Sequence, residues 1–104
     1  IFHMQQYAYI LKRMKAIKES DGSTMLDNSL VTYGAALGDG STHQYYDLPL
    51  ILAGGGQGQV KQGRFIQAKS GTLNSNMWLT LAKLMGVEMD SYADSTGVIS
   101  DLWT

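Results

Sequence analysis

LVTYGAALGDGSTHQYYDLPLILAGGGQG, from Leu30 to Gly58, is the stretch that decides the fold of this 104-residue chain. Two apolar runs flank a polar loop, and we predict a strand in each, over Leu30–Ala36 and Leu48–Ala53. Pro49 lies near the start of the second, where a missing backbone donor is tolerated. The first predicted strand, Leu30–Ala36, lacks strict alternation of apolar and polar residues. We therefore expect it to be buried on both faces, with a neighbour on each side. The connection is too short for a helical crossover of about a dozen residues, which favours antiparallel pairing.

Helical spacing of apolar residues lies on both sides of this stretch. A helix is predicted from Phe2 to about Glu19, with its apolar residues at Tyr7, Ile10, Leu11, Met14 and Ile17. The side chains mostly opposite them are Lys12, Arg13, Lys15 and Lys18. These cations are typical of a solvated helix face, and near the C-terminal end of the helix they interact favourably with its macrodipole. We prefer this interpretation over contact with an anionic partner.

A second helix is predicted over Leu73–Met85, ended by Gly86. Its apolar face is expected to carry Leu73, Met77, Leu81, Leu84 and Met85. Between the second strand and this helix, the glycine-rich segment 54–58 is expected to form a tight bend rather than a phosphate cradle, because no Gly-Lys-Ser/Thr ending follows. Gln59–Gln67 is a candidate short hairpin, and the tail Val87–Thr104 is expected to pack back through Leu102 and Trp103.

Composition sets limits on the class of protein. The net charge is −1, and charged residues make up 16% of the chain, which argues against a nucleic-acid binder. No apolar run reaches the length of about 18 residues that a membrane span needs. Because there is no cysteine, disulfides, thiol nucleophiles and thiolate metal sites are excluded. Since the first residue is Ile1, we interpret the chain as a single domain over 1–104 or the C-terminal segment of a larger α/β domain.

The motifs DNSLVTYG, GDGSTH, DLPLILAGGG and KQGRF, with the closing DSYADSTG, resemble the C-terminal part of the HxxSHH-motif family. These are exported bacterial proteins of unknown function. The resemblance covers nearly the whole chain, although His3 and His43 are the only histidines and neither lies in an HxxSHH context. The resemblance implies an exported (periplasmic or extracellular) protein, with the naming motif and export signal upstream. It also implies partners in the remainder of the parent chain or in other subunits of an exported assembly.

More remotely, the arrangement is similar to the alkaline phosphatase and sulfatase superfamily. That similarity implies the C-terminal portion of an α/β/α sandwich, with two main helices and two to four strands. It also implies divalent-metal hydrolysis of phosphate or sulfate esters. The superfamily's strand end carries a metal-binding Asp and His, whereas this chain reads Ala35-Ala36-Leu37-Gly38 there. The nearest polar candidates follow at Asp39 and His43.

Asp39 and His43 are the candidate ligands of a divalent metal ion, because carboxylates and imidazoles both bind such ions. The alternative is that Asp39-Gly40 forms a turn and His43 bonds to the backbone. The candidate ligand-binding residues share the same loop and are Ser41, Thr42, Tyr45, Tyr46 and Asp47. Two functions remain open: a metal-dependent ester hydrolase, or a non-catalytic exported binding or assembly component that uses this loop for a partner or a glycan.

Overall fold

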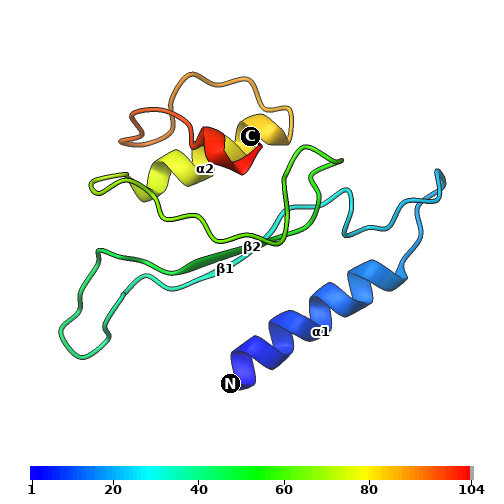
Figure 1. Ribbon diagram of the computed structural model, residues 1–104, viewed down its shortest axis with the longest axis horizontal. Coiled ribbons are helices and arrows are strands. Elements are labelled where there is room, and N and C mark those ends of the chain that lie inside the picture. Colours follow the sequence, from blue (N-terminus) through cyan, green and yellow to red (C-terminus); the bar gives the residue numbers. More distant parts are fainter. Residues whose placement is uncertain (104) are drawn as a thin grey trace. The chain divides into compact units, whose positions relative to one another are not determined.

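The computed structural model describes residues 1–103. They form two compact units, Ile1–Gly54 and Gly55–Thr104, and each is described by itself. The first holds helix α1 (Phe2–Ala16) and strands β1 (Val31–Gly34) and β2 (Leu50–Ala53). The second holds helix α2 (Asn74–Leu84) and the short 3₁₀ helix η1 (Ser100–Leu102) (Figure 1). The chain is thus mixed α/β, as predicted at this coarse level.

The two strands pair antiparallel, which confirms the prediction from the short connection. The register places Val31 opposite Ala53 and Gly34 opposite Leu50. Both strands are shorter than predicted. Within the described residues β1 pairs with β2 alone, and Val31, Thr32 and Tyr33 are half-buried. The predicted second neighbour of this strand, in the rest of a parent chain or in another subunit, stays a prediction.

Helix α1 packs against the hairpin through one aromatic side chain. Tyr7, at 8% exposed, is the one large apolar residue of positions 1–54 that is buried. Its hydroxyl donates a hydrogen bond of 2.9 Å to the Val31 carbonyl, and its ring centroid lies 5.3 Å from that of Tyr33. Burial also raises the pKa of Tyr7. This contact fixes the helix to β1 in the middle of the unit.

Helix α1 ends at Ala16, three residues before the predicted end at Glu19. Ile17 adopts extended dihedral angles (φ −84°, ψ 122°), and its carbonyl accepts a hydrogen bond of 2.9 Å from the Met25 amide. Glu19 donates to the Ser23 carbonyl at 2.8 Å across a tight turn. The chain therefore leaves the helix because these backbone groups are used by the turn, which the apolar spacing did not reveal.

Helix α2 ends as its sequence predicts. Gly86 has a φ of +83° and donates to the Lys83 carbonyl, while Val87 donates to the Ala82 carbonyl at 2.9 Å. This pair of bonds is a Schellman motif, which satisfies carbonyls at the helix end and favours glycine at the left-handed position. The helix itself spans Asn74–Leu84, one residue shorter at each end than predicted.

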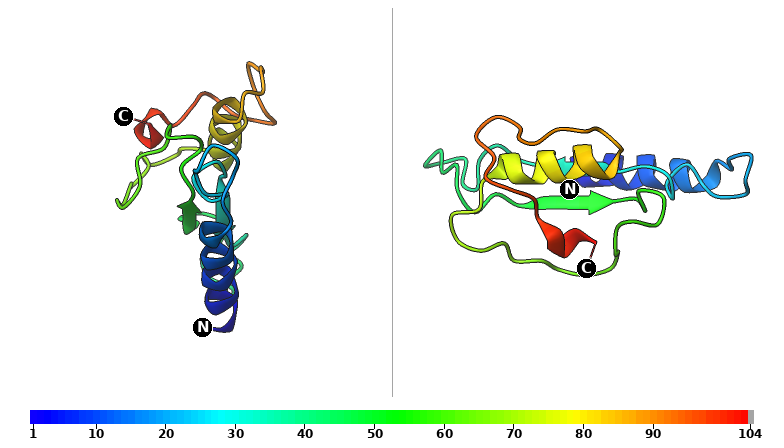
Figure 2. Two further views of the ribbon diagram at one scale, coloured as in Figure 1. Left: turned by 90° about the vertical axis from the view of Figure 1, so that its right-hand side faces the viewer. Right: turned by 90° about the horizontal axis from the view of Figure 1, so that it is seen from above.

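The buried side of α2 includes Met77 and Leu81 of the predicted apolar face, but its most buried residues were not predicted. Leu79 is 1% exposed and Thr80 is 0% exposed, whereas Met85 is 56% exposed. The Thr80 hydroxyl donates to the Asn76 carbonyl at 2.6 Å and accepts from the Ile99 amide at 2.8 Å. The Asn76 side chain bonds both the amide and the hydroxyl of Thr96. Polar residues on α2 thus fasten the tail, which runs back along the helix (Figure 2).

The segment Gln59–Gln67 is not a hairpin, so that prediction is wrong. Its backbone groups have partners elsewhere: the Val60 amide donates to Gly55 and the Lys61 amide donates to Leu102, both at 3.1 Å. The glycine-rich bend thus supplies the partner of Val60 and the tail supplies that of Lys61, so neither bond is made within the segment. Val60 and Leu102 are both buried, which confirms that the tail packs back at Leu102.

No helix in the described part of the chain is long and apolar enough to cross a membrane.

Candidate functional site

The candidate residues all lie in the connection between β1 and β2, residues 35–49, which we call the tyrosine loop. Figure 1 shows it extending beyond the strand ends of the hairpin. Almost all of its side chains are exposed, and only Gln44 and Leu48 are half-buried. The loop therefore presents its polar and aromatic groups to solvent rather than enclosing them.

The tip of the loop is closed by backbone hydrogen bonds. The Gly38 amide donates to the Gln44 carbonyl at 2.6 Å, and the Gln44 amide donates to the Asp39 carbonyl at 3.0 Å. His43 completes the turn with a φ of +54°, a left-handed conformation in which histidine is enriched among residues other than glycine. The tip has a defined backbone in spite of its exposure.

Asp39 shapes this tip with its side chain. One carboxylate oxygen accepts a hydrogen bond of 2.9 Å from the Ser41 amide, and the other accepts one of 2.9 Å from the Thr42 hydroxyl. These bonds lower the pKa of Asp39, the Ser41 amide having the larger effect. Such an Asx turn is the arrangement that the alternative interpretation of Asp39-Gly40 describes. The geometry assigns Asp39, Ser41 and Thr42 to one hydrogen-bonded group.

A metal ion needs more ligands than this group provides. Catalytic zinc sites take three ligands from the protein, and no group of three or more His, Asp or Glu side chains among residues 1–103 is placed to hold a metal. Asp39 is already engaged with Ser41 and Thr42. The described residues thus do not form a complete metal site, and the assignment of Asp39 and His43 as ligands stays a prediction that requires donors from outside them.

Tyr45, Tyr46 and Asp47, which were also predicted as ligand-binding residues, follow the tip of the loop in the chain. Tyr45 is 80% exposed and Tyr46 is 63% exposed. Asp47 follows with a φ of +52° and is exposed as well. The Gln44 side chain donates to the Tyr46 carbonyl at 3.3 Å. Two large aromatic side chains and a carboxylate at consecutive positions of the chain are therefore exposed to solvent.

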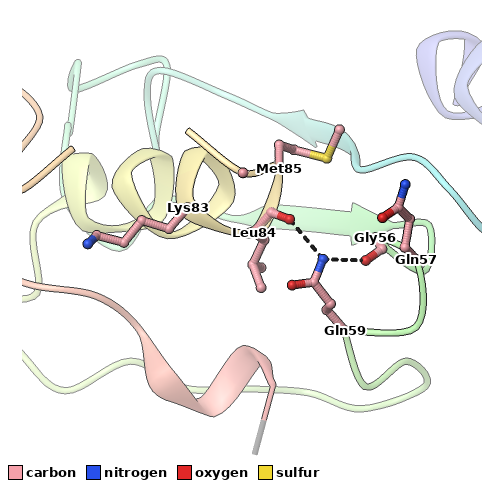
Figure 3. A pocket seen from close by; sticks show the side chains of 7 residues that line it. Gly56, Gln57, Gln59, Lys83, Leu84 and Met85 are labelled. Carbon is pink, nitrogen blue, oxygen red and sulfur yellow. Dashed lines mark hydrogen bonds between the residues drawn. The ribbon is translucent and has the colours of Figure 1, made fainter. Parts of the chain in front are cut away.

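The second unit has a shallow hollow of about 250 Å³ at the C-terminal end of α2 (Figure 3). Its lining residues are Gly56, Gln57, Gln59, Lys83, Leu84, Met85 and Gly86. The Gln59 amide nitrogen lies between the carbonyls of Gly56 and Leu84, at 2.8 Å from each. Lys83 is the one ionisable side chain of the lining. Gln59 ties the glycine-rich bend to the helix.

The bend itself confirms the prediction for the segment 54–58. Gly54, Gly56, Gln57 and Gly58 all have positive φ angles, between +52° and +101°. Sequence reasoning did not identify the structural roles of Gln59, Asn76 and Thr80. The signal for the last two was present: polar residues four apart lie beside the apolar positions of a helix, which is where a buried polar tie is placed.

Lowering the pH is expected to release the Asp39 turn. Because the folded-state pKa of Asp39 is lowered, its two hydrogen bonds stabilise the loop above the usual carboxyl pKa of about 4. They are lost as the pH falls through the lowered value. NMR should show the Ser41 amide proton shifting upfield in that acid range. Asp39→Asn should abolish this titration, and a Ser41 amide that ignores pH in the parent chain would contradict the turn.

Comparison with family models, with curated proteins and with solved structures gives no match for this chain.

Proposed function

We propose that this chain is a non-catalytic binding component and that its tyrosine loop binds a carbohydrate. The exposure of Tyr45 and Tyr46 is the observation that carries the proposal. Exposed aromatic rings of this size cost solvation free energy unless they have a contact role, and tyrosine combines an apolar ring with a polar hydroxyl. A sugar offers the matching surface, since its C–H groups pack on a ring and its hydroxyls bond to polar neighbours.

Those polar neighbours are present in the loop. Asp47 adjoins Tyr46 in the chain, and its exposed carboxylate has two oxygens that accept hydrogen bonds from sugar hydroxyls. The Ser41 side chain is exposed at the tip, while its amide is used by Asp39. The hydrogen bonds of the tip reduce the freedom that the loop must lose on binding, which improves affinity.

Substituting the two tyrosines should abolish most of the binding. Tyr45→Ala and Tyr46→Ala are each expected to weaken the affinity for a bound oligosaccharide about fivefold, because each removes roughly 1 kcal/mol of ring contact. Isothermal titration calorimetry against neutral and acidic oligosaccharides of four to six sugars measures this. Tyr92→Ala is the matched control, since Tyr92 is 48% exposed in the other unit. The proposal fails if no oligosaccharide binds, or if the Tyr92 variant loses as much affinity.

The wider context is also part of the proposal. We place the chain in an exported bacterial protein of the HxxSHH-motif family, as a portion of a larger α/β/α sandwich. The family motifs in the sequence support this, and so does the two-stranded sheet, because two strands alone are marginally stable in water. A structure of the parent protein in which a further strand pairs with β1 or β2 would support the sandwich. One in which both edges face solvent would contradict it.

The same parent protein tests the ester hydrolase. That function requires a divalent ion bound by Asp39 or His43 together with ligands from outside residues 1–103. Metal analysis of the parent protein and of its His43→Ala variant distinguishes the two functions. Stoichiometric metal that the variant loses would replace the binding proposal with the hydrolase.

A further inference from the structure

The side of α1 that faces away from β1 carries large side chains without cover. Tyr7 is buried, and Leu11 and Met14 beside it are half-buried. At 3.6 residues per turn, Phe2 and Tyr9 lie on the opposite side of the helix. They are 66% and 61% exposed. Figure 1 shows α1 beside the strands of its own unit. Because Tyr7 contacts Val31 and Tyr33 of β1, the opposite side of the helix, with Phe2 and Tyr9, faces away from β1.

The side of α1 that carries Phe2 and Tyr9 is also basic. Residues 1–18 contain four of the eight lysines and arginines of the chain and none of its nine acids. Lys12 and Arg13 follow Tyr9 by three and four residues, which places them on the same side of the helix. All four cations of the segment are exposed. The remainder of the chain has an excess of acids, so positive charge is concentrated on this one helix.

The other two cations have a neighbour of opposite charge. The pKa of Asp27 is lowered first by hydrogen bonds from Thr24 and then by the charges of Lys18 and Lys15. Lys15 and Lys18 therefore lie near a carboxylate of their own unit. Lys12 and Arg13 are the cations that remain beside the two exposed aromatic rings, and we call these four residues (Phe2, Tyr9, Lys12 and Arg13) the outward face.

We propose that the outward face of α1 docks on the surface of a bilayer that contains anionic lipid. The helix would lie in the plane of the surface, with Phe2 and Tyr9 inserted among the headgroups and the two cations paired with lipid phosphates. Tyrosine is enriched at this depth of a membrane because its ring is apolar and its hydroxyl is polar. The charge complementarity is direct, because the face has cations and no acid.

The apolar part of the face favours a lipid surface over a soluble polyanion. Ile10 flanks the outward face and is 49% exposed. Together with the two aromatic rings it forms an apolar area, which a hydrophilic polymer leaves in water and a headgroup layer removes from it. Long cationic side chains reach from such a position to the phosphates. The proposal is independent of the carbohydrate site in the tyrosine loop.

Co-sedimentation with vesicles tests the proposal on the whole chain. Vesicles of three parts phosphatidylcholine to one part phosphatidylglycerol should bind it, and pure phosphatidylcholine vesicles should bind it much less. Lys12→Gln with Arg13→Gln should weaken binding about 30-fold, at about fivefold for each cation. Phe2→Gln with Tyr9→Gln should weaken it as well, because the rings no longer insert. Binding should disappear in 1 M salt, where the screening length is about 3 Å.

The control removes two cations from the other unit. Lys69→Gln with Lys83→Gln makes the same change in net charge at exposed positions, and should leave vesicle binding unchanged. Circular dichroism checks that each variant keeps its helix content. The proposal is overturned if the chain does not bind anionic vesicles or if the control loses as much binding. It is also overturned if the aromatic variant binds as the parent chain does, since that result indicates a general polyanion contact. A Tyr45 and Tyr46 double variant should still bind the vesicles.

Discussion

Gly54→Ala is expected to lower the free energy of unfolding of the first unit by about 3–5 kcal/mol. Gly54 has a φ of +101°, a conformation that side-chain-bearing residues rarely adopt. A Cβ atom there would also overlap the Ser29 carbonyl and crowd the Leu26 carbonyl. These are backbone atoms, so they cannot move aside as a flexible side chain would. Urea unfolding followed by circular dichroism measures the loss.

Gly22→Ala separates the destabilisation that comes from the positive φ from the destabilisation that comes from overlap of the added Cβ atom. Gly22 lies in the same unit with a φ of +88°, but nothing lies within 4 Å of an added Cβ atom. It therefore carries the conformational strain without the overlap, and its expected cost is about 1 kcal/mol. Equal losses for the two variants would contradict the close approach of residue 54 to Ser29.

Leu79→Ala is expected to destabilise the second unit by about 2–5 kcal/mol, because the variant leaves a cavity where a fully buried side chain stood. Leu79 is 1% exposed, and it lies on α2 beside Thr80, whose hydroxyl ties the tail to the helix. Trp78 and Trp103 are the two tryptophans and both belong to this unit. Their fluorescence during urea unfolding therefore reports on the unit that the substitution affects.

Lys83→Ala is the control on the same helix. Lys83 is exposed, and alanine is a strong helix former, so its effect should stay within about 0.5 kcal/mol. If Leu79→Ala lowers the free energy of unfolding no more than Lys83→Ala does, the side of α2 that carries Leu79 is not buried as the structure shows.

Local signals in the sequence were enough for much of the secondary structure. Apolar spacing located both helices, and Gly86 marked the end of α2 because few other residues adopt its left-handed conformation. The short connection predicted antiparallel strands. The misjudged segments are those whose backbone groups bond outside the predicted element, either in a neighbouring turn, as at the end of α1, or to a distant partner. Residues 59–67 read as a hairpin, yet Lys61 bonds to Leu102 near the other end of the second unit.

For the candidate site, too, local features could be predicted from the sequence, whereas contacts in space could not. Asp39-Gly40 is a local turn signal, and the structure forms that turn with bonds to Ser41 and Thr42. From the sequence alone, both the metal-site and the turn interpretation of Asp39 and His43 remained open. The sequence shows which ligand types are present but not which of them are close together in space. The number of ligands that meet at a point is a property of the folded chain.

The sequence by itself determined the types of element, their order and the polar loop between the strands, since these depend on spacing and turn chemistry within a few residues. Only the tertiary structure decided which surfaces are left uncovered. Helical spacing predicted Tyr7 and Ile10 on the same apolar face, but Tyr7 is buried against Val31 and Ile10 is 49% exposed. The reason is physical: burial depends on what packs against a helix face, and that partner lies far away along the chain.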